Sequence, residues 1–258
     1  MSTAGENQKF NFESKVAVVT GGTRGIGRAV SLSLARQGAK VFALYGRDSK
    51  NALELDTIAK NEGLNILCIK GDLSNDEKFS DVVNQIKSNV HQINFIVHCA
   101  ASGVHRNAME LSLKHLRWTF EINVFAIHHL IQELISLMPK GSKIIGVTSS
   151  GGTRVIPYYA AVGSSKGALE SLFRHYAYEL APIGVNVNLV CPGLVLTDAV
   201  DAFPDRDARV EKAKGATPTG ELVTPIEVAD AVSFLCSNHA SQIVGQTLVL
   251  DGGKTLLS

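Results

Sequence analysis

The sequence contains no hydrophobic run long enough to cross a bilayer, because no apolar stretch in its 258 residues approaches the roughly 18 residues that a membrane helix needs. Residues 1–14 are polar and lack the apolar core flanked by basic residues that marks a secretory signal. We therefore expect a cytoplasmic protein without a membrane partner.

The chain also has no long run of basic residues, and its formal net charge is only +1. Nucleic acids and anionic membranes attract clustered lysine and arginine, so no nucleic acid or membrane is expected as the main partner. The balanced charge favours a small-molecule substrate instead.

Cysteine is scarce, with four residues far apart in the sequence: Cys68, Cys99, Cys191 and Cys236. None belongs to a CxxC pair, and each lies in an apolar segment, so we expect reduced core residues with no disulfide and no bound metal. No repeat or low-complexity linker interrupts the chain. Its 45% hydrophobic content is enough for one large core, and residues 1–258 are predicted to form a single domain.

Short apolar runs alternate with segments of helical periodicity along the whole chain. The predicted strands are 15–20, 40–45, 64–69, 93–98, 143–148, 184–191 and 247–251. Uninterrupted β-branched strands between helices are typical of a parallel sheet that is buried on both faces. The sequence therefore predicts an α/β, doubly wound Rossmann fold with a seven-stranded parallel sheet flanked by helices on both faces.

Two features near the end of the chain complete this prediction. Residues 198–222 depart from strand and helix regularity and are predicted to form a mobile substrate lid. Thr224, Pro225 and Glu227 then predict a helix start, with Thr224 as the cap and Glu227 completing a capping box.

Three glycines follow the first strand and precede a helix with apolar periodicity. Gly21, Gly25 and Gly27 form a GxxxGxG pattern in the order strand, turn, helix. A dinucleotide needs a tight turn, a backbone close to its pyrophosphate, and the free N–H groups of a helix N-terminus. This segment therefore predicts a dinucleotide site.

The second strand ends in Gly46-Arg47, with no acidic residue at its tip to bind both hydroxyls of an adenosine ribose. Arg47, helped by Arg24 in the glycine turn, matches the oxygens of a 2′-phosphate, so NADPH is favoured over NADH. The alternative is that both arginines are solvated surface charges. After the third strand, Asp72 either meets the adenine edge or caps the next helix.

Proton-handling groups gather after the fifth strand. A hydroxyl, a phenol and an ammonium occur there as Ser149, Tyr159 and Lys166. If a helix begins at about Tyr158, the seven-residue spacing turns Tyr159 and Lys166 to within about 20° of one face. The position one turn before Lys166 is Val162, which can do no acid chemistry. Tyr159 is the predicted proton donor, and the alternative is that the two tyrosines are packing residues.

Two more polar residues lie close to the predicted site. Asn123 falls within a helix predicted over 111–138, where its amide either braces the backbone or holds a water in a proton path. His98 ends the fourth strand and is predicted to be a hydrogen-bonded structural residue. The small residues that follow it suit a strand end lying against a flat ligand: Cys99, Ala100 and Ala101.

Seven motifs together resemble the short-chain dehydrogenase/reductase family across essentially the whole chain. They are Thr20-Gly-Gly-Thr-Arg-Gly-Ile-Gly27, Asp72-Leu73, Asn123, Ser149, Lys166, Pro192-Gly193 with Thr197, and Asp251-Gly-Gly253. The resemblance implies a nicotinamide cofactor and a catalytic site that includes Asn123, Ser149 and Lys166. It also implies cofactor contacts from Gly21, Thr23, Arg24, Gly25, Ile26, Gly27, Asp72, Leu73, Cys99, Ala100, Ala101, Lys166, Pro192, Gly193 and Thr197.

In the branch of this family that converts ketones and alcohols, a tyrosine lies four residues before the lysine, where this chain has Val162. The gap between Tyr159 and Lys166 instead resembles the enoyl-acyl-carrier-protein reductase branch. The NADPH-dependent FabL type is the most similar, through Ala100-Ala-Ser-Gly-Val104, Met109-Glu-Leu111, Val162-Gly163, Ser165-Lys-Gly-Ala-Leu169, Phe203-Pro204 and Gly245-Gln-Thr247. This resemblance implies an enoyl thioester on acyl carrier protein, a role in fatty acid or allied acyl or polyketide synthesis, and a homotetramer or homodimer.

Enoyl reduction explains why the phenol lies at Tyr159 rather than three residues later at position 162. Hydride addition to the β-carbon of an enoyl thioester places negative charge on an oxygen three bonds away, whereas ketone reduction places it one bond away. Three helical residues shift an anchor by about 4.5 Å along the axis, which is of the right order. We expect Tyr159 to hydrogen-bond the enolate oxygen and Lys166 to bind the nicotinamide ribose. The alternatives are reduction of another activated alkene or ketone, and a non-catalytic cofactor-binding regulator.

Overall fold

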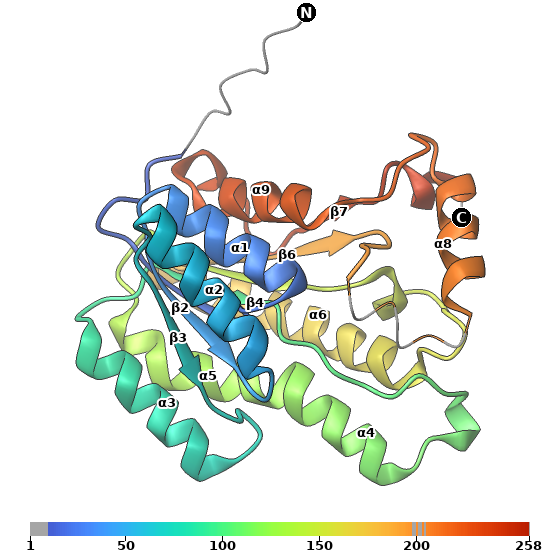
Figure 1. Cartoon of the computed structure of the whole chain (residues 1–258), viewed down its shortest axis with the longest axis horizontal. Coiled ribbons are helices and arrows are strands. Elements are labelled where there is room, and N and C mark those ends of the chain that lie inside the picture. Colours follow the sequence, from blue (N-terminus) through green and yellow to red (C-terminus); the bar gives the residue numbers. More distant parts are fainter. Residues whose placement is uncertain (1–9, 198–199, 201–202, 204, 258) are drawn as a thin grey trace, which may run out of the picture.

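Seven parallel strands form a sheet at the centre of the protein (Figure 1). The computed structural model describes residues 10–197, 200, 203 and 205–257, and within them the strand order is β3-β2-β1-β4-β5-β6-β7. All neighbouring pairs are parallel, which confirms the predicted sheet. The strands are β1 (Val16–Thr20), β2 (Lys40–Tyr45), β3 (Ile66–Lys70), β4 (Phe95–His98), β5 (Lys143–Val147), β6 (Asn186–Pro192) and β7 (Thr247–Leu250).

Helices cover both faces of the sheet. Figure 1 shows α1 (Gly25–Arg36), α2 (Ser49–Glu62) and α9 (Pro225–Cys236) on one side, and α3 (Asp76–Asn89), α5 (Ala126–Leu134) and α6 (Ala160–Leu180) on the other. Successive side chains of a strand point to opposite faces, so Val18 joins the core with α5 and α6 while Val19 joins the core with α1 and α9. Because both faces are buried, the strands are apolar throughout.

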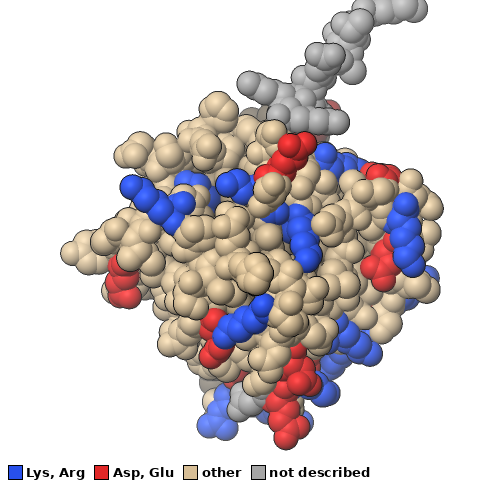
Figure 2. Space-filling model, turned by 90° about the vertical axis from the view of Figure 1, so that its left-hand side faces the viewer, with Lys and Arg blue, Asp and Glu red and all other residues tan. Residues whose placement is uncertain are grey.

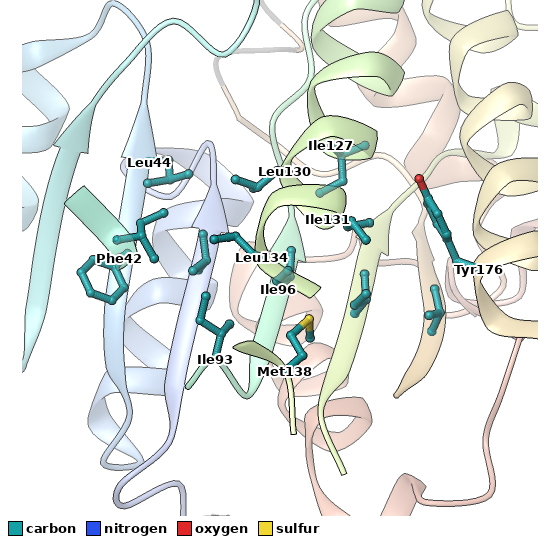
Figure 3. Close-up of a cluster of buried hydrophobic side chains, with 14 of the residues drawn as sticks. Phe42, Leu44, Ile93, Ile96, Ile127, Leu130, Ile131, Leu134, Met138 and Tyr176 are labelled. Atoms are coloured by element: carbon teal, nitrogen blue, oxygen red, sulfur yellow. The ribbon is translucent and has the colours of Figure 1, made fainter. Parts of the chain in front are cut away.

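The larger of the two cores lies between the sheet and α3, α5 and α6. Figure 3 shows Phe42 and Leu44 of β2 and Ile96 of β4 beside Leu130 and Leu134 of α5. None of these five side chains is more than 1% exposed. Burial of an apolar side chain of this size contributes about 1.5–3 kcal/mol of transfer free energy. This core therefore fixes the helices that border the site described below.

The helix predicted over 111–138 contains a π-helical turn. Its parts are α4 (Leu113–Phe120), the π turn (Glu121–Phe125), α5, and a 3-10 turn (Ile135–Leu137). A π turn inserts an extra residue into a helix and is frequent at functional sites. Asn123 lies in this turn.

The prediction of an irregular lid over 198–222 is wrong for much of that segment, because α8 (Arg206–Ala216) is an 11-residue helix within it. Val210 and Ala213 are its buried residues, so the sequence carries too little apolar periodicity to reveal it. Residues 198, 199, 201, 202 and 204 lie outside the described residues. The capping box that follows is confirmed, because Thr224 and Glu227 each accept the other's backbone N–H at the start of α9.

The surface carries both signs of charge. On the face that Figure 2 shows, basic and acidic side chains are interspersed. Along the part of the chain that the structure describes, no helix combines the length and apolar character needed to cross a bilayer.

The four cysteines are free thiols. Cys191 and Cys236 are buried as predicted, whereas Cys68 and Cys99 are only partly buried. Burial raises the pKa of Cys191 to about 11 and the pKa of Cys68 and of Cys99 to about 12. These three thiols therefore stay protonated near neutral pH.

Candidate active site

The carboxyl ends of the central strands form one edge of the sheet. β1 lies inside the sheet, with β2 and β3 on one side and β4 to β7 on the other, so the strand order changes direction between β1 and β4. In open parallel sheets, ligands bind outside the carboxyl ends at such a point. The glycine turn after Thr20 begins there.

The backbone of the glycine turn excludes other residue types. Gly21 and Gly25 have φ values of 65° and 50°, in the left-handed region. A Cβ added at Gly27 would lie 2.0 Å from the Gly21 carbonyl oxygen. The first helix, α1, begins at Gly25, and the side chain of its N-cap residue, Arg24, makes no capping hydrogen bond. The turn therefore leaves room and N–H donors for the phosphates of a dinucleotide.

The segments predicted to bind the cofactor meet around this turn. A Cβ added at Gly21 would lie 2.9 Å from Ala100 Cα, and one added at Gly25 would lie 3.3 Å from Thr197 Cγ2. The β4 end and the segment after β6 therefore both approach the glycine turn. The predicted contacts that gather at this edge are Gly21, Thr23, Arg24, Gly25, Ile26, Gly27, Cys99, Ala100, Ala101, Pro192, Gly193 and Thr197.

A cavity of about 640 Å³ opens beside the carboxyl ends of β2 and β3. Three cations are in its lining: Arg47, Lys70 and Lys78. Asp48, the acidic residue closest after the β2 tip, caps α2 instead, and its carboxylate accepts a hydrogen bond from the Asn51 backbone N–H at 3.1 Å. Two carboxylates, Asp72 and Asp81, lie in the same lining, so the cavity offers a guanidinium and two ammonium groups to a 2′-phosphate with a small excess of positive charge.

Asp72 also lines this cavity. Its carboxylate accepts hydrogen bonds from the Ser74 backbone N–H at 3.1 Å and from the Ser74 hydroxyl at 2.6 Å. These bonds, and more weakly the charges of Arg47 and Lys78, hold the pKa of Asp72 below its usual value. The helix-capping alternative for Asp72 is wrong, because Asn75 caps α3. The neighbouring Leu73, predicted as a cofactor contact, packs its side chain against the larger core.

His98 is a buried structural residue, as predicted. Its Nδ1 pairs with Thr20 Oγ1 at 2.8 Å, and its Nε2 pairs with the Asn123 carbonyl oxygen at 3.2 Å. The Asn123 carbonyl can only accept, so the neutral ring donates from Nε2, and its Nδ1 then accepts the Thr20 hydroxyl proton. Thr20 Oγ1 in turn accepts from the Ala100 N–H. Burial, with a smaller effect of the Lys166 charge, lowers the pKa of His98 to about 3.

Asn123 braces the backbone, the first of the two roles predicted for it. Its Oδ1 accepts from the Ser102 N–H at 2.8 Å. Its Nδ2 donates to the Ser102 carbonyl at 3.0 Å and to Ser165 Oγ at 2.9 Å. Both amide hydrogens are therefore used within the protein. Asn123 ties the loop after β4 to α6, and so positions the small residues at the β4 end against the glycine turn.

Lys166 lies at the bottom of the site, only 4% exposed. Its Nζ donates to the Val147 carbonyl oxygen at 2.8 Å, which leaves two of its three hydrogens for other partners. Burial lowers the pKa of Lys166 to about 8, while Cys99, Glu170 and Cys191 act in the opposite direction.

The helix that carries Lys166 begins at Ala160, later than the predicted start at about Tyr158. Tyr158 has a φ of 64°, which no residue within a right-handed helix adopts. Tyr159 is the N-cap residue, with a φ of −108°, and its carbonyl accepts the hydrogen bond of the Gly163 N–H. Tyr159 therefore stands at the edge of the helix, and the helical angle expected between it and Lys166 does not apply.

The structure nevertheless brings Tyr159 into the predicted site. Its phenol lies beside the side chain of Ser149, two residues beyond the end of β5 at Val147. Burial raises the pKa of Tyr159, and the Ser149 side chain, as a polar neighbour, acts in the opposite direction. The phenol is thus protonated at neutral pH and has a hydroxyl next to it, as suits a proton donor.

Aromatic rings surround the Tyr159 ring. The Phe203 ring stacks on it with centroids 5.9 Å apart and an angle of 18°, and the His105 ring lies 5.8 Å away. His105 lies in a loop where no periodicity or motif in the sequence marks it. Glu170 is a buried carboxylate whose one signal in the sequence is its place four residues after Lys166.

The parallel sheet, the glycine turn, the partly buried Ser149 and Tyr159, and the buried Lys166 define a nicotinamide-dependent oxidoreductase of the Rossmann type. Comparison with known proteins then identifies the family. A family model described as "Enoyl-(Acyl carrier protein) reductase" matches residues 21–255. The chain belongs to the short-chain dehydrogenase/reductase family, as its sequence motifs predicted.

Similar proteins include both enoyl and ketone reductases. The 1-cyclohexenylcarbonyl-CoA reductase of Streptomyces collinus is 30% identical over 95% of this chain and 88% of its own. The 3-oxoacyl-acyl-carrier-protein reductase FabG of Vibrio cholerae is 32% identical over 96% of this chain and 100% of its own. A short-chain dehydrogenase from Burkholderia cenocepacia, solved in complex with NADP, superposes with a TM-score of 0.85 at 26% identity, over 95% of this chain and 99% of its own.

Proposed function

We propose that this protein reduces the α,β-double bond of an enoyl thioester with NADPH. The observation that carries the proposal is the position of its phenol, since Tyr159 is the acid that lies beside Ser149. The residue one helical turn before Lys166 is Val162, which is 5% exposed and has no proton to donate. The proton donor is therefore carried three residues before Val162, at the N-cap of α6.

This displacement fits the distribution of charge in enoyl reduction. Hydride addition to the β-carbon of a conjugated thioester moves negative charge to the carbonyl oxygen, three bonds from the carbon that is reduced. A donor aimed at that oxygen stabilises the charge where it develops. The relative from Streptomyces collinus supports the assignment, because the substrate in its name is a conjugated enoyl thioester.

Each polar residue of the site has a role in this reaction. When bound, NADPH supplies the hydride. Tyr159 donates a hydrogen bond to the enolate oxygen, and Ser149 orients the phenol. Lys166 is anchored by the Val147 carbonyl, and its two remaining hydrogens are available to the ribose hydroxyls beside the nicotinamide. Asn123 holds the loop after β4 and acts through the backbone.

The preference for NADPH rests on the basic cavity at the ends of β2 and β3. Arg47 lies at the β2 tip, where the 2′-phosphate of an adenosine ribose is expected. Lys70 and Lys78 add two positive charges to the same lining. Asp48 is engaged as the α2 cap, and the Asp72 carboxylate in the lining is engaged with Ser74, so Arg47 is the group at the β2 tip that is placed to meet the phosphate.

The acyl chain is proposed to arrive on acyl carrier protein, in fatty acid synthesis or an allied acyl pathway, and the enzyme to work as a homotetramer or homodimer. The description of the matching family model supports the carrier, whereas the name of the Streptomyces collinus relative specifies a CoA thioester. Turnover of one crotonyl group presented on each carrier distinguishes them. Sedimentation velocity gives the number of subunits.

A second candidate is reduction of a β-ketoacyl thioester. The similarity to FabG of Vibrio cholerae, whose name specifies a 3-oxoacyl substrate, favours it. The structure gives it weaker support, because Val162 replaces the tyrosine that ketone reductases of the family carry one turn before the lysine.

One panel of reactions tests these assignments. NADPH absorbance is followed with crotonyl thioester, with a β-ketoacyl thioester, and with no substrate. The proposal predicts consumption with the crotonyl thioester alone. Consumption only with the ketone overturns it in favour of the second candidate, and tight NADPH binding without turnover of either substrate points to a cofactor-binding regulator.

A further inference from the structure

Glu170 is a buried carboxylate one helical turn beyond Lys166 on α6. Only 7% of its surface is exposed. Residues four apart on a helix lie on the same face, so Glu170 and Lys166 both point toward the end of β5. A carboxylate in such a place is unfavourable unless it is hydrogen-bonded and near a positive charge. Glu170 has the first of these from Thr148, whose hydroxyl donates to Glu170 Oε1 at 2.7 Å.

Three consecutive residues at the end of β5 each lie against one side chain of the α6 segment. The Val147 carbonyl accepts from Lys166, the Thr148 hydroxyl donates to Glu170, and the Ser149 side chain lies beside the Tyr159 phenol. Glu170 therefore holds the residue between the one that binds the lysine and the one that neighbours the proton donor.

The space for this carboxylate is provided by a glycine. A Cβ added at Gly152 would lie 2.8 Å from Glu170 Oε1 and 3.1 Å from the Gly167 backbone nitrogen. Gly152 belongs to the 3-10 turn Ser150–Gly152 that connects β5 to the loop before α6. The close approach of this turn to the helix keeps Glu170 out of water and near the site.

The titratable groups that raise the pKa of Lys166 come from three parts of the fold. Cys99 follows β4, Cys191 lies on β6, and Glu170 is on α6 itself. Burial raises the pKa of Cys99 to about 12 and of Cys191 to about 11, so both thiols are neutral where Lys166 titrates. His98, whose pKa is about 3, is neutral there as well.

Tyr159 is the remaining titratable group of the site, and burial raises its pKa too. Among the groups that raise the pKa of Lys166, Glu170 is therefore the one that is not a thiol.

We propose that Glu170 is a positioning residue that holds Lys166 in its charged form and fixes the β5 end to which Lys166 and Tyr159 are attached. The proposal deepens the proposed reductase function, since it concerns the same site. It depends on Lys166 taking part in cofactor binding, and it does not depend on which acyl substrate is reduced.

The test measures the charge of Lys166 directly in the protein without cofactor. Selective ¹³Cε labelling of lysine gives a titration curve for Lys166, assigned by the signal that disappears in Lys166→Arg. In the wild type the midpoint is expected near the pKa of about 8. In Glu170→Gln, which keeps the size and the acceptor for Thr148, the midpoint is expected to fall by about one pH unit. The high-pH limit of NADPH binding, measured by nicotinamide fluorescence, is expected to move with it.

Thr148→Val is the matched control. It removes the hydrogen bond to Glu170 but keeps the carboxylate, so we expect a lower rate with the Lys166 midpoint not displaced downward. A residue that only packs α6 against β5 produces the opposite pattern, in which both variants lose stability and neither moves the midpoint. That pattern overturns the proposal.

A further variant covers the case in which Glu170→Gln does not fold. Glu170→Asp retains the charge but withdraws it by one methylene, so the Lys166 midpoint is expected to fall in the same direction by a smaller amount. A midpoint at the wild-type value in Glu170→Asp then counts against the proposal. If the midpoints move as expected while crotonyl thioester is not reduced, the role of Glu170 stands and the proposed substrate fails.

Discussion

Val162 and Gly103 are in such close contact that a Cβ added at Gly103 would lie 2.3 Å from Val162 Cγ2. Val162 belongs to α6 and is 5% exposed, and Gly103 belongs to the loop after β4. Asn123 pins this loop through both backbone groups of Ser102, so the loop has little freedom to retreat. The position one turn before Lys166 is therefore a tightly packed apolar wall.

A tyrosine at this position is not expected to create a ketone reductase. In Val162→Tyr the ring has to displace the loop at Gly103, and overpacking of this kind costs about 1–3 kcal/mol. We expect a lower Tm and no gain in turnover of a β-ketoacyl thioester. Val162→Ala is the control, because it relieves the contact without adding a phenol. A Val162→Tyr variant that keeps the wild-type Tm and reduces the ketone shows that the packing around Val162 does not exclude a tyrosine.

Loss of the Tyr159 phenol is expected to reduce kcat by about a hundredfold, because removal of one donor to a developing oxyanion costs about 3 kcal/mol. Tyr159→Phe keeps the ring and its stacking on Phe203, and removes only the hydroxyl beside Ser149. Steady-state turnover of crotonyl thioester measures the effect. NADPH affinity, measured by fluorescence, is expected to stay near that of the wild type.

The adjacent tyrosine supplies a matched control for this variant. Tyr158 is 37% exposed, with its backbone in the left-handed region. Tyr158→Phe is expected to turn over at the wild-type rate. Full activity of Tyr159→Phe refutes the assignment of the phenol, and equal losses in both variants indicate a packing role for the pair.

Much of the fold follows from local signals in the sequence. The strand predicted over Lys40–Tyr45 has the observed bounds, because it is a β-branched and aromatic run between glycines. The capping box at Thr224 is equally local, since three residues determine it. The glycine turn was predictable because its φ values and close contacts admit glycine alone.

Other features depend on contacts that a sequence pattern does not encode. Apolar residues at helical spacing predicted one helix over 111–138, and the π turn at Glu121–Phe125 is invisible to that spacing. The late start of α6 results from the left-handed φ of Tyr158, which is not a residue type expected there. Helix α8 was missed because just two of its residues are buried. The pairing of Glu170 with Thr148 joins two elements and needs the tertiary structure.

The activity is expected to decline above about pH 8. Burial lowers the pKa of Lys166 from 10.5 to about 8, so the ammonium is present below that pH and is lost above it. Cys99 and Cys191, with pKa values of about 12 and about 11, do not titrate in the same range. The pH profile of kcat/KM with crotonyl thioester shows the decline as its basic limb.

Lys166→Arg checks that this limb belongs to the lysine. An arginine side chain stays charged at every accessible pH, so the activity that remains in this variant is expected to show no decline near pH 8. If the kcat/KM of the wild type stays level well above pH 8, the rate does not depend on the charge of Lys166.

Arg47→Ala is expected to lower the preference for NADPH over NADH by about ten- to a hundredfold, because a hydrogen bond to a charged group contributes about 1.5–3 kcal/mol. The measurement is kcat/KM for each cofactor at a fixed concentration of crotonyl thioester. Arg36→Ala is the control, since Arg36 ends α1 and pairs with Glu62 rather than lining the cavity. If Arg47→Ala keeps the wild-type preference, Arg47 is a surface charge, and Lys70 and Lys78 become the candidates for the phosphate contact.

Phe203 links α8 to the proton donor, and its loss is expected to slow the reaction by up to about tenfold. Its ring stacks on Tyr159, while the Arg209 guanidinium lies 4.2 Å from the Phe203 centroid and is paired with Asp205. An aromatic pair of this kind contributes about 0.5–1.5 kcal/mol beyond its buried area. Phe203→Ala is therefore expected to loosen the Tyr159 ring and lower kcat.

Phe203→Leu separates stacking from bulk, because it retains apolar volume beside Tyr159 but has no ring for Arg209 to face. We expect its kcat to lie between those of the wild type and Phe203→Ala. If both substitutions raise KM and leave kcat unchanged, Phe203 contributes equally to binding of the acyl substrate and of its transition state, and it does not position the phenol. The measurement is the kcat and KM of the two variants with crotonyl thioester at saturating NADPH. These constants decide between the two roles, because a change in kcat is expected only if the phenol itself has moved.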